Sequence, residues 1–272
     1  MHSSLNPSQS SRPSQSRAAT SSAQGPRERN EDAWLCLPEL GIYAVADGMG
    51  GLVDGHEASR TTLDLVAQRA PALAACFSQH GAAAQGAVVR ELDGLFRDAS
   101  ALVSDLAATR GGRMGCTLTL AVLGEDRLLI AHVGDSRAYL VRGDEVRQLT
   151  EDHSVAALRV RLGRMTAEDA ERSPLRNRLY QAIGVTEEPE PDVVELQLSA
   201  GDALLLCSDG LWEPLDMERV AGLIAGRSAA AAVRAVVGAA EAVGLSDNAT
   251  GVLIQTMAAG GGLDRAGLLR SA

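Results

Sequence analysis

The stretch "YAVADGMGG", residues 43–51, opens with alternating apolar residues and then stops at Asp47, which is followed by three glycines within four positions. The apolar residues predict a buried strand. A carboxylate at the mouth of a buried strand is costly unless a partner or a cation compensates its charge. Asp47 therefore has three roles open to it, as a helix cap, as the partner of an arginine or as a metal ligand. The structural alternative is a simple Asp-Gly turn.

Acidic residues recur where other predicted strands begin or end. The set consists of Glu31, Asp32, Asp47, Asp135, Asp209 and Asp247, the last followed by Asn248. If these strand ends meet at one edge of the sheets, the like charges lie too close for all of them to stay ionised without cations. A set of oxygen ligands without a histidine-cysteine group selects Mg²⁺, Mn²⁺ or Ca²⁺.

Paired divalent ions favour one type of chemistry. Two such ions lower the pKa of a bridging water and direct it at phosphorus, so the cluster predicts hydrolysis of a phosphate ester. Arg27 lies beside the acidic pair at residues 31–32, and a guanidinium fork matches two phosphate oxygens. The alternative for Arg27 is a solvated surface residue.

Composition excludes several classes of protein. The net charge is −10 and every cationic side chain other than histidine is an arginine, which argues against nonspecific nucleic-acid binding. No apolar run approaches the roughly 20 residues of a membrane-spanning helix, so we expect a cytoplasmic protein without a membrane segment. The four cysteines form no CxxC pair, which favours buried free thiols in a reducing compartment over a zinc site or a disulfide framework.

The sequence predicts one domain with a tail at each end. Residues 1–16 are rich in Ser, Pro and Gln and predict a disordered tail, since they have almost nothing to bury. Residues 258–272 predict a glycine joint with a flexible tail. The domain between them covers residues 17–257, and it lacks an internal repeat or a second linker.

Two kinds of apolar segment are expected within the domain. Strands are predicted at Trp34–Leu37, Gly41–Ala46, Cys116–Leu123, Arg127–Val133, Arg137–Arg142, Val193–Leu198, Ala203–Cys207 and Val252–Thr256. Helices are predicted at Gly55–Ser78, Gln85–Thr109, Asp216–Ala225 and Ala229–Val243. Short turns after Leu123, Val133, Val141 and Leu198 are too short for a parallel crossover, so the strands that they join are expected to be antiparallel neighbours. The blocks of strands and helices predict an α+β domain of antiparallel sheets covered by helices.

Seven short motifs in this order resemble the metal-dependent type 2C (PPM) protein phosphatases, and most closely the compact bacterial branch that acts on phosphoserine and phosphothreonine. The motifs are "RERNED" (27–32), "ADGMGG" (46–51), "GCTLT" (115–119), "AHVGDSRAYL" (131–140), "QLTEDHS" (148–154), "LLLCSDGLW" (204–212) and "SDNAT" (246–250). They span nearly the whole chain. The resemblance implies two antiparallel sheets sandwiched between pairs of helices, with a flap subdomain at about residues 151–184.

Carried over position by position, the resemblance implies a centre with two Mn²⁺ or Mg²⁺ ions. Asp47 would bridge them. Asp209 and Asp247 would complete the first site, and the Gly48 carbonyl and Glu31 would serve the second.

The remaining roles also follow from the resemblance. Asp32 would orient metal-bound waters, and Asp135 with Asp209 would hold the third ion typical of bacterial members. Asn248 would support Asp247, and Arg27 would grip the substrate phosphate. The expected reaction is direct attack by a metal-bridged hydroxide without a phosphoenzyme.

The chain departs from the family pattern at a few positions. Met49 stands where some members carry a histidine proposed as general acid, so the leaving-group proton is expected from a metal-bound water. Leu52 and His56 replace a usual histidine and glutamate on the loop, and Ser173 replaces a frequent flap histidine. These changes affect the loop and the flap and leave the ligands in place.

Three alternatives stay open beside a protein phosphatase. They are a catalytically dead phosphoprotein-binding module, a phosphatase of a partner-switching regulator, and a cysteine-based phosphatase using Cys207. The expected partners are phosphorylated proteins and a cognate Ser/Thr kinase, without nucleic acid or membrane, and we expect a monomer.

Overall fold

The computed structural model describes residues 16–50, 54–125 and 127–257. The tails predicted at residues 1–16 and 258–272 lie outside these ranges except for Ser16, which already begins a strand. The strands are β1 (Ser16–Ala23), β2 (Ala33–Leu37), β3 (Ile42–Ala46), β4 (Gly48–Gly50), β5 (Met114–Cys116), β6 (Leu118–Leu123), β7 (Arg127–Val133), β8 (Arg137–Arg142), β9 (Glu145–Gln148), β10 (Asp192–Gln197), β11 (Ala203–Cys207) and β12 (Ala249–Thr256). The helices are α1 (Gly55–Phe77), α2 (Ala82–Thr109), α3 (Val155–Arg161), α4 (Ala167–Glu171), α5 (Asp209–Trp212), η1 (Met217–Arg219), α6 (Val220–Ile224) and α7 (Ala229–Val243).

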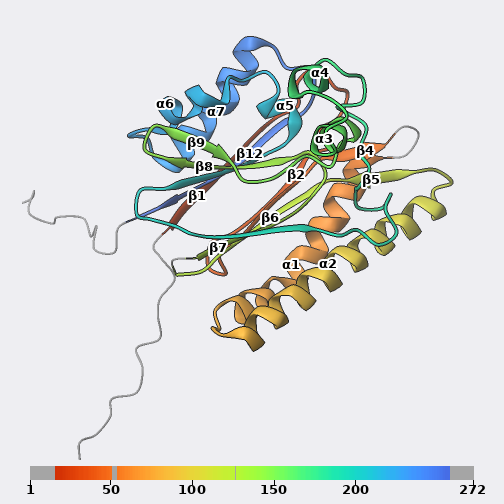
Figure 1. Ribbon diagram of the computed structural model, residues 1–272, viewed down its shortest axis with the longest axis horizontal. Coiled ribbons are helices and arrows are strands. Elements are labelled where there is room, and N and C mark those ends of the chain that lie inside the picture. Colours follow the sequence, from red (N-terminus) through yellow and green to blue (C-terminus); the bar gives the residue numbers. More distant parts are fainter. Residues whose placement is uncertain (1–15, 51–53, 126, 258–272) are drawn as a thin grey trace, which may run out of the picture.

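Two five-stranded sheets form the centre of the molecule. One has the strand order β1-β12-β11-β8-β9 and the other β10-β7-β6-β3-β2, and every strand pair is antiparallel. Figure 1 shows α1 and α2 on one outer face and α5 to α7 on the other, with α3 and α4 at one end. The prediction of an α+β sandwich with helices on both outer faces and a flap is confirmed.

The sequence forms these layers because both faces of the central strands are apolar. In β3, Ile42 and Ala44 pack under α1 and α2, whereas Tyr43 and Val45 face the other sheet. All five residues of β3 are completely or almost completely buried. Burial of each large apolar side chain contributes about 1.5–3 kcal/mol, so this strand anchors both halves of the sandwich.

Two of the four short turns do not form the hairpins that their length predicted. The turns after Leu123 and Val141 do join antiparallel neighbours, β6 to β7 and β8 to β9. The turns after Val133 and Leu198 instead carry the chain from one sheet to the other, because β7 and β8, like β10 and β11, belong to different sheets. Turn length excludes a parallel crossover within one sheet but does not exclude a corner between two sheets.

Other differences concern weakly apolar or interrupted segments. Strand β1 was not predicted because its Ser, Thr and Ala residues lack an apolar alternation, yet it pairs along its whole length with β12. The strand predicted at Cys116–Leu123 is interrupted at Thr117, which leaves the ladder to bond Asp47. The helix predicted at Asp216–Ala225 is split into η1 and α6. In the described part of the chain, no helix is both long and apolar enough to span a bilayer.

Candidate active site

The acidic strand ends meet at one edge of the sandwich. Strands β3 and β7 both pair antiparallel with β6, so Asp47 and Asp135, which follow them, lie at the same edge of one sheet. In the other sheet, β11 ends where β12 begins, which brings Asp209 beside Asp247. Hydrogen bonds join the two edges, since Ser208 Oγ donates to Asp32 Oδ2 at 2.7 Å and the Glu31 N–H donates to Asn248 Oδ1 at 2.8 Å.

Four of these carboxyls share one electrostatic environment. Burial raises the pKa of Asp32 to about 7 and that of Asp209 to about 6, and the charge of Asp247 adds to both shifts. The pKa of Asp47 is raised well above its usual range by burial and then by Asp32, Asp209 and Asp135. Burial and Asp209 act on Asp135 in the same direction. The proximity that the sequence predicted is therefore present, at a cost to every ionised carboxylate.

Two hydroxyl residues hold this cluster in place. Thr117 Oγ1 accepts a hydrogen bond from the Asp47 N–H at 2.9 Å, and the Thr117 N–H donates to the Asp47 carbonyl at 2.9 Å. Ser208 donates to Asp32 and accepts from the Thr250 N–H at 2.9 Å. The sequence alone assigned no role to Thr117 or Ser208, although both belong to the quoted motifs. Ser208 directly precedes Asp209, and Thr117 faces Asp47.

Glu31 and Gly48, the expected ligands of the second ion, lie against the start of α1, and Asn248, the expected support of Asp247, is bonded to it. Glu31 Oε1 accepts from the Gly55 N–H at 3.2 Å, and burial raises the pKa of its carboxyl. A Cβ at Gly48 would lie 2.2 Å from the Gly55 carbonyl oxygen, so only glycine fits between Glu31 and the start of α1. The Asn248 N–H donates to Asp247 at 2.8 Å, and its amide also binds the Gln24 carbonyl at 2.7 Å.

Arg27 does not point into free solvent, because it forms an ion pair with Asp247. Its side chain is 56% exposed and can therefore rotate away without breaking the core. The ring of His56, one of the family departures, lies 3.4 Å from the Arg60 guanidinium in the first turns of α1. Leu52 lies outside the described residues.

Divalent cations fit the donor set of this cluster. In the conformation of residues 16–50, 54–125 and 127–257, no three His, Cys, Asp or Glu side chains are close enough together to hold an ion without rearrangement. Asp32 Oδ1 and Asp209 Oδ1 are nevertheless buried and find no hydrogen-bond partner among the described residues. Buried carboxylate oxygens of this kind require either a proton or a cation. Rotation of Asp247 away from Arg27 would complete an all-oxygen set suited to Mg²⁺ or Mn²⁺.

A groove of about 680 Å³ leads from Asp135 along the flap. Its walls come from α3 and α4 on one side and from Trp212, Glu213 and Met217 on the other. Ser173, the family departure in the flap, caps a local turn by accepting from the Leu175 N–H at 3.2 Å. The groove is open to the surface and lies directly beside the carboxylate cluster.

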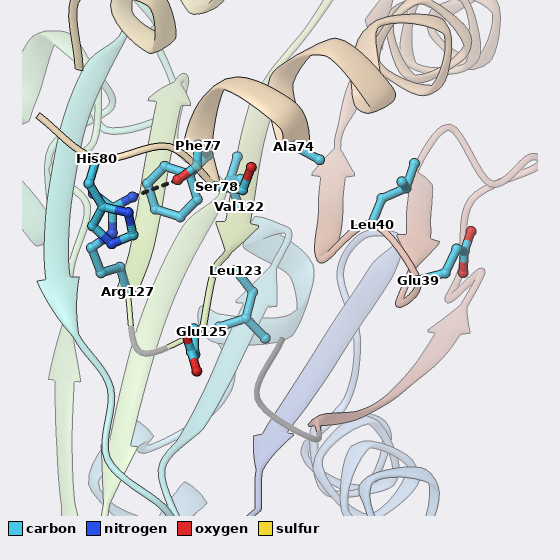
Figure 2. Close-up of a pocket in the computed structure, with 11 residues that line it drawn as sticks. Glu39, Leu40, Ala74, Phe77, Ser78, His80, Val122, Leu123, Glu125 and Arg127 are labelled. Atoms are coloured by element: carbon cyan, nitrogen blue, oxygen red, sulfur yellow. Dashed lines mark hydrogen bonds between the residues drawn. The ribbon is translucent and has the colours of Figure 1, made fainter. Parts of the chain in front are cut away.

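A second, smaller cavity of about 190 Å³ lies where α1 ends against the β6–β7 turn. Figure 2 shows Arg127 reaching across it to the Phe77 carbonyl, which it binds at 2.5 Å while its guanidinium stacks on the Phe77 ring at 4.5 Å. These contacts cap the C-terminus of α1. The cavity therefore has a structural explanation and shares none of its lining residues with the carboxylate cluster.

Comparison with known proteins identifies relatives of this arrangement. A sequence model described as protein phosphatase 2C matches residues 21–248. The serine/threonine phosphatase stp of Listeria welshimeri is 32% identical over 217 residues, which are 79% of this chain and 84% of that protein. The stp of Listeria innocua is 46% identical, but over a stretch that covers 36% of this chain and 39% of that relative. The catalytic domain of the phosphatase PstP, solved with two manganese ions, superposes with a TM-score of 0.74 at 30% identity, covering 89% of this chain and 98% of that one.

Proposed function

This chain belongs to the metal-dependent protein phosphatase 2C family and is a protein serine/threonine phosphatase, and we propose that its carboxylate cluster is the centre that hydrolyses phosphoserine and phosphothreonine. The observation that supports this proposal is the gathering of Asp32, Asp47, Asp135 and Asp209 with raised pKa values at one edge of the sandwich. Such a cluster is destabilising in itself, and binding of divalent cations offsets its cost.

Each ligand has a place in this proposal. Asp47 would lie between two ions, Asp209 and Asp247 would complete one site, and the Gly48 carbonyl with Glu31 would complete the other. Asp135 with Asp209 would hold a third ion. When bound, Mn²⁺ or Mg²⁺ supplies Lewis-acid activation of water and neutralises phosphate charge.

The chain's own polar groups then position the reactants. Asp32 Oδ1 has no partner among the described residues and can accept a hydrogen bond from the attacking water, while Ser208 holds the other oxygen. Arg27 would leave Asp247 and bind two phosphate oxygens of the substrate through its guanidinium fork. The Asp247 carboxylate freed in this way becomes available as a ligand.

The two fully buried thiols are poorly suited to act as a nucleophile. Burial raises the pKa of both Cys116 and Cys207 to about 12, so neither forms a thiolate near neutral pH. Cys207 lies inside β11 and is completely buried. This environment disfavours the cysteine-based alternative.

We further propose that the substrates are proteins phosphorylated by a cognate Ser/Thr kinase in the cytoplasm, and that the enzyme acts as a monomer. The groove beside Asp135 offers room for residues flanking the phosphorylated one. The net charge of −10 supports a protein substrate over nucleic acid.

Turnover of a phosphothreonine peptide tests the proposal. We expect phosphate release with Mn²⁺, loss of activity on treatment with EDTA, recovery on adding Mn²⁺ back, and little change after treatment with a thiol alkylator. Asp202→Asn, far from the cluster, serves as the matched carboxylate control. Absence of turnover in the presence of Mn²⁺ would indicate a phosphoprotein-binding module, and EDTA-resistant activity lost on alkylation would indicate a thiol mechanism.

A further inference from the structure

Two buried histidines lie next to the candidate metal ligand Asp135, and the proposed reaction uses neither of them. His132 is completely buried in β7, and His153, at the start of the flap, is 1% exposed. Their ring centroids are 5.1 Å apart. Burial, followed by the neighbouring His153, lowers the pKa of His132 to about 3, so its ring is neutral. The buried His132 imidazole therefore acts as a hydrogen-bonding group.

Both histidines bind the backbone of the same residue, Gly134. The Gly134 N–H donates to His153 Nδ1 at 3.3 Å, and its carbonyl accepts from His132 Nε2 at 3.0 Å and from the His153 backbone N–H at 2.7 Å. Gly134 has a φ of +116°, and a Cβ there would lie 2.5 Å from Thr117. The turn that carries Asp135 between the two sheets is therefore held at both peptide groups that flank the Gly134 Cα.

These contacts fix the proton on each ring. A carbonyl only accepts, so His132 Nε2 carries the hydrogen and Nδ1 accepts from Thr119 Oγ1, 2.9 Å away. The Gly134 N–H only donates, so His153 Nδ1 is the acceptor. His153 Nε2 then carries a hydrogen and donates to Asp192 Oδ2 at 3.1 Å. His153 thus joins the Asp135 turn to the edge strand β10.

His153 also connects the two ends of the flap. The Tyr180 N–H, near the flap's end, donates to the His153 carbonyl at 2.8 Å, and the two rings lie 5.4 Å apart. The preceding residue, Asp152, accepts two hydrogen bonds of 2.8 Å from Arg137. Arg137 stacks on Trp212 at 3.3 Å, and Trp212 Nε1 donates to the Asp135 carbonyl at 3.1 Å. Both sides of Asp135 are therefore tied to the beginning of the flap.

We propose that His153 is a positioning residue that locks the Gly134–Asp135 turn to the flap, through the hydrogen bond from the Gly134 N–H to its Nδ1. The consequence for Mn²⁺ binding rests on the proposed role of Asp135 as a ligand. Residues that orient a ligand typically change metal affinity by about 10–100-fold when they are replaced.

Two amide substitutions separate the two ring contacts. His153→Asn places a carbonyl oxygen close to the position of Nδ1 that can still accept from Gly134, but the shorter side chain does not reach Asp192. His153→Gln places an amide close to the position of Nε2 that can still donate to Asp192, but the acceptor for Gly134 is lost. The control is His80→Asn, because His80 is exposed and lines the distant cavity in Figure 2.

Tryptic cleavage of the metal-free protein gives a readout that is independent of activity. The flap carries exposed arginines, whose cleavage is followed by mass spectrometry: Arg159, Arg161, Arg164, Arg172, Arg176 and Arg178. For His153→Gln we expect flap cleavage about tenfold faster than in the wild type, and Mn²⁺ binding to the proposed Asp135 site, measured by calorimetry, weakened by about tenfold. For His153→Asn and His80→Asn we expect both values within about threefold of the wild type.

Every other pattern overturns the proposal. Equal effects of Asn and Gln would indicate only a packing role, and a larger effect of Asn would transfer the role to Asp192. If neither variant folds, ¹⁵N NMR of the wild-type histidines decides, because the proposal requires His153 to be protonated at Nε2 and not at Nδ1. If the wild type released no phosphate with Mn²⁺, the proposed function would be refuted. The cleavage and NMR results on the metal-free protein would still test the His153 contact.

Discussion

Strand β11 has an aspartate at each end, and the two differ in their partners. Asp202, which precedes the strand, is 2% exposed and accepts from Arg142 at 2.9 and 2.7 Å and from the Ser199 N–H at 2.7 Å. Burial would raise its pKa, but these hydrogen bonds outweigh burial and lower it. Asp209, beyond the other end, has a raised pKa and one oxygen without a partner among the described residues.

This contrast separates a carboxylate that is paired within the fold from a proposed metal ligand. Asp202 has its charge compensated within the fold and contributes to stability. Asp209 lies among carboxylates of the same sign, and we propose that a cation from outside the chain compensates its charge. Substitutions at the two ends of β11 should therefore act on different properties of the protein.

The largest effect is expected for Asp209→Asn. This change preserves the shape of the side chain but removes a proposed ligand, so kcat/KM for a phosphothreonine peptide should fall by more than about 100-fold. Replacing a residue that only orients a ligand typically has a smaller effect, of about 10–100-fold. The metal-free protein should unfold at an equal or higher temperature, because one like charge is gone. A full rate at limiting Mn²⁺ would refute the assignment, and the same measurement on Asp247→Asn extends the test to the second ligand.

The clustered carboxylates Asp32 and Asp209 should affect the pH dependence of stability in the opposite direction to the paired carboxylate Asp202. Folding raises the pKa of Asp32 to about 7 and that of Asp209 to about 6, so the folded protein binds more protons than the unfolded chain between about pH 4 and 7. The stability of the metal-free protein should fall across this range as pH rises, by an amount on the order of a few kcal/mol. Thermal unfolding in EDTA measures it. Asp32→Asn should flatten the slope and Mn²⁺ should restore stability at pH 8, whereas an unchanged slope in the variant would contradict the account.

Asp202→Ala should have the converse effect of Asp209→Asn. Removal of the carboxylate leaves Arg142 and the Ser199 N–H unpaired, at a cost of about 1–3 kcal/mol in the free energy of unfolding. Urea denaturation measures this loss. In the wild-type protein the same loss of stability should appear as pH falls below the pKa of Asp202, because protonation removes the charge of its carboxylate. The kcat of the folded enzyme should stay within about threefold of the wild type. A large decrease in kcat with unchanged stability would indicate that Asp202 also serves the active site.

The smallest effect is expected for Arg27→Ala. The loss of one exposed phosphate contact should raise KM by about tenfold, or about 1.4 kcal/mol, with a smaller change in kcat. Mn²⁺ binding without substrate should not weaken, since the substitution frees Asp247 from its ion pair. Weaker Mn²⁺ binding with unchanged KM would instead assign Arg27 a structural role.

Much of the fold could be predicted because local patterns and global packing agree. The alternating residues of β3 face two different cores, and the apolar face of α7 gives its bounds of Ala229–Val243 as predicted. The acidic strand ends were also visible, since each follows or precedes an apolar run. The two corners between sheets were misread because a short turn looks the same whether it joins strands of one sheet or of two.

The groups that hold the site were harder to predict. Thr117 interrupts an apolar run, and only the structure shows that this interruption pairs with both backbone groups of Asp47. Ser208 and His153 make contacts to residues far away in the sequence, which no periodicity reveals. The pairing of Arg27 with Asp247 across 220 residues is of the same kind.

Anomalous scattering from crystals grown with Mn²⁺ tests most directly whether the carboxylates gathered from distant strand ends hold the catalytic ions. We predict at least two manganese peaks among Glu31, Asp47, Asp209 and Asp247, with Arg27 released from Asp247. Crystals with bulk Mn²⁺ but no anomalous peak among these side chains, and with the Arg27 ion pair intact, would contradict the account.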